Sequence, residues 1–324
     1  MHLLMLLVTV CWASNIIAGK QALTGFGAPA LAQLRMLGTA AVYLIAFVAS
    51  GRMRRLPLTP RKELFLVIVA AAGIALNQIT FIGGMALSTV AHAGLIVALG
   101  PVMVLVIAVV IHLEALTAWK LTGMVLAFAG VAILTLDKAG QGSSSQFLGD
   151  LILVASTLVF AIYTILVKEV ADRFDALTLN TFIFVLGALM MFPFCAHAVT
   201  LTNWAGLSFE AWWGLGFMIV FGSVMSYLLF AYVLTELAAS RVAAFNYLQP
   251  VIAAGLAIWL LSERLTSKVL IGGSLILAGV CLAERERGEE KAGAASDPQV
   301  LSGRNPSRNH FDDGAAVLRS QDKG

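Results

Sequence analysis

The stretch GPVMVLVIAVVIHLEALTAWKLTGMVLAFAGVAIL (100–134) returns later in the chain as QPVIAAGLAIWLLSERLTSKVLIGGSLILAGV (249–280). With a shift of 149 residues, twelve of the thirty-one positions in 101–131 and 250–280 are identical, without a gap. The identical pairs include Pro101 with Pro250, Glu114 with Glu263, Thr117 with Thr266, Gly123 with Gly272, and Gly130 with Gly279. Upstream the match is weaker, and a shift of 148 pairs Lys20 with Lys168 and Phe26 with Phe174. Such self-similarity at a fixed distance indicates an internal duplication.

The composition places the duplicated chain in a membrane. Of the 324 residues, 60% are hydrophobic and only 12% are charged, and the mean hydropathy is +0.90. A soluble domain has roughly a quarter of its residues charged. So little charge cannot cover a water-facing surface, and we expect the apolar excess to face lipid.

The apolar runs predict ten transmembrane helices, and the fold class is therefore an all-α integral membrane protein. A helix needs about 20 apolar residues to cross the hydrocarbon core. The runs are continuous rather than alternating, which excludes a β-barrel. The predicted spans are 3–19, 28–50, 64–85, 90–112, 118–136, 148–169, 177–199, 211–234, 241–261 and 266–283.

Five spans in each half give the second half the opposite orientation. The predicted organisation is a first repeat at 3–136, a polar linker at 137–147, a second repeat at 148–283 and a disordered cytoplasmic tail at 284–324. The tail is too polar to bury a core. Inverted repeats are the architecture of many secondary transporters, because two similar halves can exchange conformations and open a central site to either side. The alternative is that duplication only built a stable bundle.

Lysine and arginine predict that both termini are cytoplasmic. If the N-terminus is inside, so is the loop GRMRRLPLTPRK (51–62), and so is the tail, whereas the outer side holds Lys20, Lys138, Arg264 and Lys268. The predicted location is the bacterial inner membrane.

The repeated motifs resemble those of the EamA family of the drug/metabolite transporter superfamily. CWASNIIAGK (11–20) is similar to the opening of the first span in that family, and ALAQLRMLG (30–38) resembles its arginine motif in the second span. The two repeated stretches resemble its P…E-x-L-T…G…G-V pattern, so that the resemblance covers about 3–283. It implies ten helices, cytoplasmic termini and a central cavity between the halves, but no particular substrate.

Polar residues inside the spans are the candidate binding residues, because polar groups in a bilayer turn toward protein or water. Trp12 and Asn15 share one face of the first helix. Trp12 is expected to stack on a substrate, whereas Asn15 suits either a substrate or interhelical packing. Arg35 suits a substrate carboxylate or phosphate, or the carbonyls of a broken helix.

Further candidates occupy matching positions of the two halves. Asn77 and Gln78 lie in the middle of the third span, and the repeat aligns them with Ser226 and Tyr227. The remaining predicted cavity residues are Tyr163, Asn246, Tyr247 and Gln249. Pro101 and Pro250 each remove a backbone hydrogen bond and are predicted hinges, or alternatively packing features.

The charged residues near the helix ends receive structural interpretations. His92 and its counterpart Arg241 are interpreted as solvated helix ends, with a gate as the alternative. Thr117 and Thr266 are predicted N-caps. Aspartate and glutamate are not expected near the middle of any span, which disfavours proton coupling through a buried glutamate but leaves coupling through His92 open.

These features predict a secondary transporter for a small metabolite, such as an amino acid, moved outward. Catalytic and nucleotide-binding motifs are not found, and the three cysteines have no metal-binding spacing, so we expect no enzyme, cofactor or metal. The expected partners are a small-molecule substrate and the lipid bilayer, without nucleic acid, and a homodimer is left open. A receptor or scaffold and a drug exporter are the alternatives.

Overall fold

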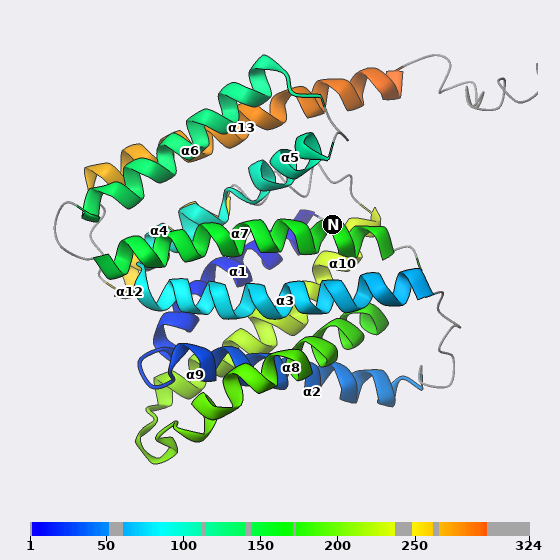
Figure 1. The fold of residues 1–324 in the computed structure, drawn as a ribbon, viewed down its shortest axis with the longest axis vertical. Helices are drawn as coiled ribbons and strands as arrows, with labels where there is room; N and C mark the ends of the chain where they lie inside the picture. The colour runs from blue at the N-terminus through cyan, green and yellow to red at the C-terminus, as the bar shows by residue number, and fades with distance from the viewer. Residues whose placement is uncertain are drawn as a thin grey trace, which may run out of the picture.

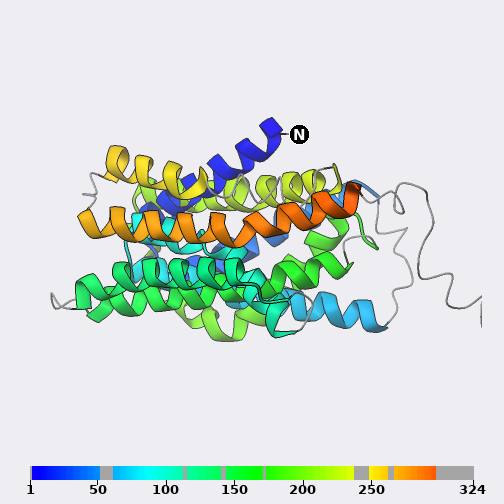
Figure 2. The ribbon, with the colours of Figure 1, turned by 90° about the horizontal axis from the view of Figure 1, so that it is seen from above.

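A computed structural model describes residues 2–51, 61–111, 115–139, 144–170, 173–236, 248–261 and 266–296. Over these residues the protein is all-helical, and the helices form ten apolar segments (Figures 1 and 2). Seven of them are long and apolar enough to cross a membrane. They are α1 (His2–Ala22), α2 (Ala28–Ala49), α3 (Arg61–Leu87), α4 (Val90–Val97) joined to α5 (Gly100–Val110), α7 (Ser144–Val170), α8 (Ala176–Thr200), and α9 (Phe209–Ile219) continued by η3 (Val220–Met225) and α10 (Ser226–Glu236).

Three shorter apolar helices complete the set of ten, namely α6 (Ala118–Ala139), α12 (Leu248–Leu261) and α13 (Ser267–Ser296). The predicted ten-helix membrane fold is therefore confirmed. Large apolar side chains remain on the outside of the bundle, among them Phe65, Phe194 and Trp259, which are 63%, 81% and 77% exposed. Contact with lipid makes such a surface favourable.

Equivalent helices of the two halves pack against one another in opposite directions. On α2 and α8, Gln33 donates to the carbonyl of Ala188, whereas ten residues further along α2 the carbonyl of Tyr43 accepts from Thr181. The residue numbers rise along one helix as they fall along the other, so the two helices are antiparallel. This is the arrangement that an inverted repeat requires.

α6 and α13, the last helices of the two halves, show the same relationship through glycine (Figure 1). A β-carbon on Gly123 would lie 2.6 Å from the carbonyl oxygen of Gly279, and one on Gly130 would lie 2.6 Å from that of Gly272. The repeat equates Gly123 with Gly272 and Gly130 with Gly279. Exchanging the two halves therefore reproduces the same pair of contacts, as a two-fold axis between them would.

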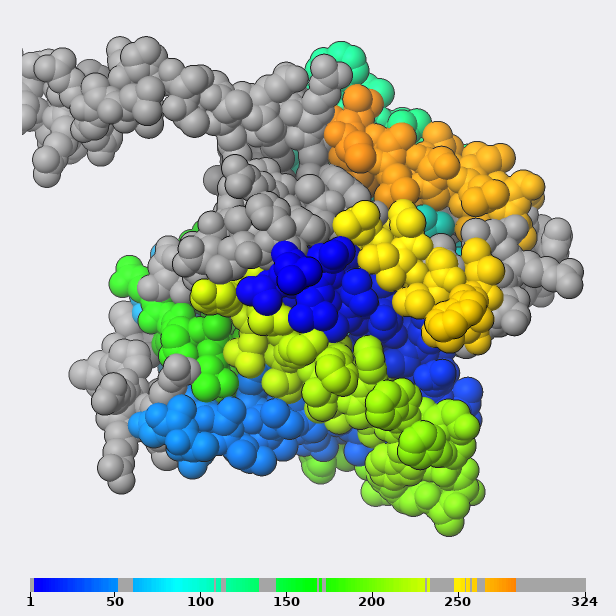
Figure 3. All heavy atoms as spheres, turned by 180° about the vertical axis from the view of Figure 1, so that it is seen from behind, coloured from blue at the N-terminus to red at the C-terminus, as the bar shows by residue number. Residues whose placement is uncertain are grey.

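A third set of contacts is exchanged by the repeat. α1 packs against α9 and η3, and α3 packs against α7; Figure 3 shows α1 between α12 and the α9–α10 segment. A β-carbon on Gly222 would lie 2.7 Å from Cγ of Asn15, and one on Gly73 would lie 3.7 Å from Cβ of Tyr163. A shift of 149 residues relates Gly73 to Gly222, and a shift of 148 relates Asn15 to Tyr163. The two-fold relationship therefore extends to the middle of the bundle.

Two helices begin at the N-caps that the repeat predicts. Thr117 Oγ1 accepts from the backbone N–H of Lys120 at 3.3 Å, and Thr266 Oγ1 accepts from that of Val269 at 3.2 Å. A threonine hydroxyl satisfies a backbone N–H that has no partner within the helix. Both cap predictions are confirmed, whereas Glu114 and Glu263 lie outside the described residues.

The structure differs from the sequence prediction at the linker and the tail. α6 continues to Ala139 and α7 begins at Ser144, so both ends of the predicted linker 137–147 are helical. α13 runs to Ser296, well past residue 283. The added part, ERERGEEKAGAA (284–295), is polar but rich in good helix formers. Its composition rules out a packed core without ruling out a helix.

Candidate functional site

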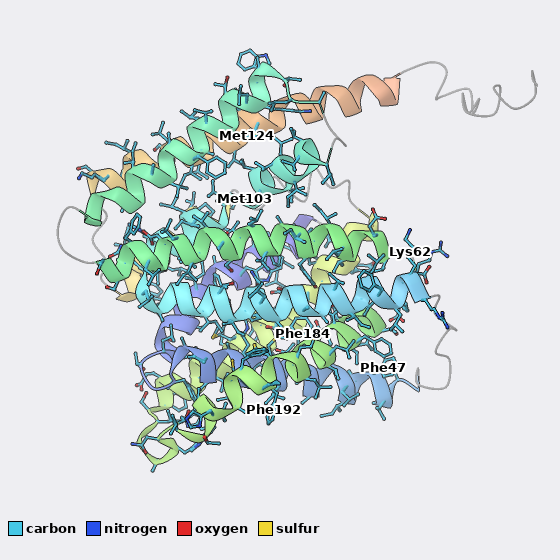
Figure 4. All side chains as sticks on the ribbon, in the orientation of Figure 1. Phe47, Lys62, Met103, Met124, Phe184 and Phe192 are labelled. Atoms are coloured by element: carbon cyan, nitrogen blue, oxygen red, sulfur yellow. The ribbon has the colours of Figure 1, made fainter. Side chains whose placement is uncertain are left out.

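Aromatic rings from five helices meet around Tyr227 on α10, and we call this set the Tyr227 cluster. The Tyr227 ring lies 6.0 Å from Trp12, 6.5 Å from Tyr163 and 5.3 Å from Phe184, centroid to centroid. Phe184 lies a further 5.4 Å from Tyr43, and Figure 4 shows it on α8 beside α3. The cluster consists of Trp12, Tyr43, Tyr163, Phe184 and Tyr227. Three predicted binding residues are thus brought together.

Equivalent positions of both halves are buried within the bundle. Asn15 aligns with Tyr163 at a shift of 148, and Gln78 aligns with Tyr227 at a shift of 149. Asn15 and Gln78 are buried, as are Tyr163 and Tyr227. A site shared by two inverted halves is expected to use such matched positions.

Arg35 on α2 binds the π-helical segment η3. Its Nε donates to Ser223 Oγ at 3.1 Å, and its Nη2 donates to the carbonyl of Gly222 at 3.4 Å. Tyr43, two turns further along α2, donates to the carbonyl of Val224 at 3.1 Å. A π-helical turn shifts the backbone pairing from i+4 to i+5 and is common at functional sites. Arg35 therefore binds a carbonyl of an irregular helix, which is one of the two partners that the sequence predicts for it.

Arg35 also retains capacity to bind a ligand. Its guanidinium has five N–H donors, of which two make the hydrogen bonds given above. The side chain is only 3% exposed, and it interacts electrostatically with Tyr227 of the cluster. A buried cation beside aromatic rings suits a ligand that carries a carboxylate and an apolar group.

Four buried side-chain oxygens are unsatisfied among the described residues, namely Asn15 Oδ1, Gln33 Oε1, Thr39 Oγ1 and Gln78 Oε1. Two of them, those of Asn15 and Gln78, belong to predicted binding residues. Leaving such an oxygen unpaired costs about 1–3 kcal/mol. A ligand that donates N–H groups would remove that cost.

Asn77, by contrast, is occupied by helix packing. Its Nδ2 donates to the carbonyl oxygen of Ser156 at 3.0 Å and to the Ser156 Oγ at 2.9 Å. Ser156 lies on α7, the antiparallel neighbour of α3. The amide therefore joins two helices, in the way that polar residues do within membranes.

The remaining predicted residues lie on or near α12. Gln249 and Pro250 are buried in its first turn, where the backbone of Pro250 faces Gly94 of α4. Asn246 and Tyr247 lie outside the described residues. In the first half, Pro101 stands in the first turn of α5, directly after a break in the helix at Ala98 and Leu99. The fourth span is therefore interrupted where the sequence predicts a hinge.

A second polar cluster was not predicted from the sequence. His92 Nδ1 on α4 lies 2.7 Å from Asp150 Oδ2 on α7, and Ser88 Oγ donates to the other carboxylate oxygen. His92 is 3% exposed and Asp150 is 1% exposed, so the interpretation of His92 as a solvated helix end is wrong. Asp150 is the third residue of the predicted span 148–169, but α7 begins at Ser144 and carries the carboxylate into the bundle.

Comparison with known proteins agrees with this architecture. The model of the EamA-like transporter family matches residues 1–136 and 147–284. The chain belongs to the EamA-like transporter family. It is accordingly a multi-pass membrane transporter and not an enzyme.

Similar proteins span nearly the whole EamA-like chain. An uncharacterized transporter of Archaeoglobus fulgidus is 24% identical, covering 87% of this chain and 97% of its own length. The uncharacterized transporter YvbV of Bacillus subtilis is 28% identical, with coverages of 90% and 94%. A probable terminal-alkyne amino-acid exporter of Streptantibioticus cattleyicolor is 24% identical, with coverages of 87% and 92%.

A solved structure shares the fold. A crystal structure of a protein 16% identical to this chain superposes with a TM-score of 0.60, covering 87% of this chain and 96% of that one. At this identity the likeness concerns the fold alone.

Proposed function

We propose that this protein is a secondary transporter that exports a small zwitterionic metabolite, an amino acid or a close relative, by alternating access. The observation that carries the proposal is a set of buried groups within the bundle. Arg35 is a buried cation, Asn15 and Gln78 present amide oxygens that are unpaired among the described residues, and the Tyr227 cluster supplies aromatic faces.

These groups match the three parts of an amino acid. A carboxylate accepts hydrogen bonds from a guanidinium, an ammonium donates to amide oxygens, and an apolar side chain packs against aromatic rings. One relative is described as a probable terminal-alkyne amino-acid exporter, which favours both this substrate class and the outward direction. The match to these groups and the description of this relative both make an amino acid a better candidate than a cationic drug.

The inverted halves supply the alternation. In our proposal they rock about the Tyr227 cluster, with the break before Pro101 and the first turn of α12 at Pro250 absorbing the movement. In our proposal both termini lie in the cytoplasm of a bacterial cell, and so does the end of α3 that carries Lys62, which Figure 4 labels. Arg173 and Glu63, whose charged groups are 3.6 Å apart, lie on the same face.

Counterflow in liposomes tests the substrate class. Purified protein is reconstituted with an unlabelled amino acid inside, and uptake of the same radiolabelled amino acid is followed. Exchange that saturates, together with thermal stabilisation by the same compound, is the expected result. If a panel of neutral amino acids gives neither exchange nor stabilisation, the proposed substrate class is wrong.

Variants test the site. Trp12→Phe, Tyr227→Phe and Arg35→Lys keep size or charge while changing the proposed contacts, and we expect each to raise KM for counterflow about tenfold. Asn246→Ala tests the predicted residue that lies outside the described region. Phe192→Ala is the matched control, because Phe192 is 52% exposed on the outer side of α8 (Figure 4). Unchanged flux in both Trp12→Ala and Asn246→Ala would refute the site.

Fusions to the C-terminus test the orientation. Green fluorescent protein fluoresces in the cytoplasm, whereas alkaline phosphatase is active only outside it. We expect a fluorescent fusion and an inactive phosphatase fusion. The opposite pair of results would invert the proposed topology and the proposed direction of transport.

A further inference from the structure

The cluster around His92 and Asp150 joins the two halves of the protein. His92 and Ser88 precede or begin α4 in the first half, and Asp150 lies on α7 in the second. Lys20, near the end of α1, donates to the Ser88 carbonyl. The cluster lies at the membrane face opposite to Lys62, because α3 runs from Lys62 at one face to Leu87 at the other.

We propose that the His92–Asp150 pair is a proton-binding latch, which holds this face closed more tightly when the imidazole is protonated. Its part in transport rests on the function proposed above. The binding of the proton and the closing of this face do not depend on that function.

The hydrogen bonds define where the proton binds. The Asp150 carboxylate only accepts, so His92 Nδ1 must carry the hydrogen in the 2.7 Å contact. Gln146 Nε2 lies farther from the same nitrogen, at 3.4 Å, and does not compete. A further proton taken from water at this face therefore binds Nε2 and gives an imidazolium, which returns the proton to water when the face opens.

Protonation changes the strength of the contact rather than its geometry. The hydrogen bond to the Asp150 carboxylate is charge-assisted in both states, and protonation of the imidazole adds the attraction between two opposite charges, which burial keeps water from screening. When α4 and α7 separate, water replaces both partners and the advantage is lost. A proton therefore binds the closed arrangement better than the open one, and by linkage it favours closure.

The described parts of the helices packed around the pair carry the following charged residues. α1 contributes Lys20 and α7 contributes Asp150, whereas α12 has no charged residue in its described range. Lys268 of α13 is exposed, and the charged residues of α3 (Arg61, Lys62 and Glu63) stand at its opposite end. α6, which packs against α7, carries Lys120 at its start and Asp137 and Lys138 near its end.

The repeat aligns His92 with Arg241, which lies outside the described residues. An arginine side chain remains charged at every physiological pH, so the repeat does not duplicate the imidazole. Acidification is expected to bias the halves toward closure at the Lys20 face rather than to tighten both faces equally.

Hydrogen–deuterium exchange of the full chain in lipid nanodiscs tests the latch without a substrate. Peptides that cover 86–97 and 144–154 report opening of this face, and peptides that cover 61–68 report the opposite face. Wild type and variants are compared at each pH, so that the intrinsic pH dependence of exchange cancels. His92→Gln keeps a polar side chain but cannot titrate, and His197→Gln removes an exposed histidine on α8 as the matched control.

We expect the ratio of open to closed arrangements in wild type to rise about tenfold from pH 5.5 to pH 8, as the imidazolium–carboxylate pair becomes a hydrogen bond from a neutral imidazole to the carboxylate. His92→Gln and Asp150→Asn should abolish that change, and His197→Gln should preserve it. A wild-type profile without pH dependence at 86–97 and 144–154, or one unchanged in a folded His92→Gln or Asp150→Asn protein, would overturn the latch. A positive exchange result without any amino-acid flux would leave the latch standing and refute only the proposed substrate.

Discussion

The side chain of Asn15 on α1 covers Gly222 of the π-helical segment so closely that no β-carbon fits between them. The carbonyl of the same glycine accepts from Arg35 on α2. One residue without a side chain thus allows α1 to approach and α2 to bind the same turn. The close approach brings Trp12, one turn before Asn15, to within 6.0 Å of the Tyr227 ring.

Gly222→Ala is expected to destabilise the protein by about 1–3 kcal/mol, because the new methyl group overlaps Asn15. Thermal unfolding in detergent measures the loss. Gly216→Ala in the same span is the control, since a β-carbon there meets nothing within 4 Å. Combining Gly222→Ala with Asn15→Ala should recover part of the loss, because the two residues are in contact. Equal stability of the two single glycine variants would contradict the packing.

Tyr43→Phe is expected to cost about 1–2 kcal/mol, because the Val224 carbonyl loses its donor at 3.1 Å inside the bundle. The ring contact with Phe184 remains, so the change isolates the hydroxyl. The midpoint of thermal unfolding is the measurement. A midpoint equal to that of the wild type would show that the carbonyl finds another partner.

Gly123→Ala and Gly279→Ala should each separate α6 from α13 and lower stability by about 1–3 kcal/mol. In both cases the added β-carbon would lie 2.5 Å from a backbone nitrogen of the other helix, which cannot rotate away. Because the two glycines face each other, similar losses are expected. Gly255→Ala on α12 is the control, with open space at its β-carbon. A harmless Gly123→Ala would argue against this close crossing.

Asn77→Ala and Ser156→Ala should have similar effects on stability, of about 0.6–1.7 kcal/mol, the range of single hydrogen bonds between membrane helices. The double variant should lose less than the sum, because the two residues bond to each other. KM for counterflow should stay unchanged in both. A raised KM with unchanged stability would indicate that Asn77 binds the substrate.

The membrane class, the ten helices, the duplication and its inversion could all be predicted from the sequence alone. These properties depend on the length of apolar runs and on an odd number of spans per half, both of which can be counted without knowing how the helices pack. The caps at Thr117 and Thr266 are equally local. The helical start of the tail shows where composition alone is insufficient, since a polar segment can form a helix without a core.

The direction in which each polar side chain turns depends on how the helices pack and could not be predicted from the sequence. In a soluble helix the polar face marks water, but here both lipid and protein neighbours are apolar, so hydropathy does not encode the rotation of a helix about its axis. Asn77 and Gln78 are adjacent in sequence, yet Asn77 binds Ser156 while the amide oxygen of Gln78 is unpaired among the described residues. His92 and Asp150 are 58 residues apart and meet only because α4 and α7 pack together. Such contacts join helices that are distant in sequence, and their partners are set by packing rather than by local pattern.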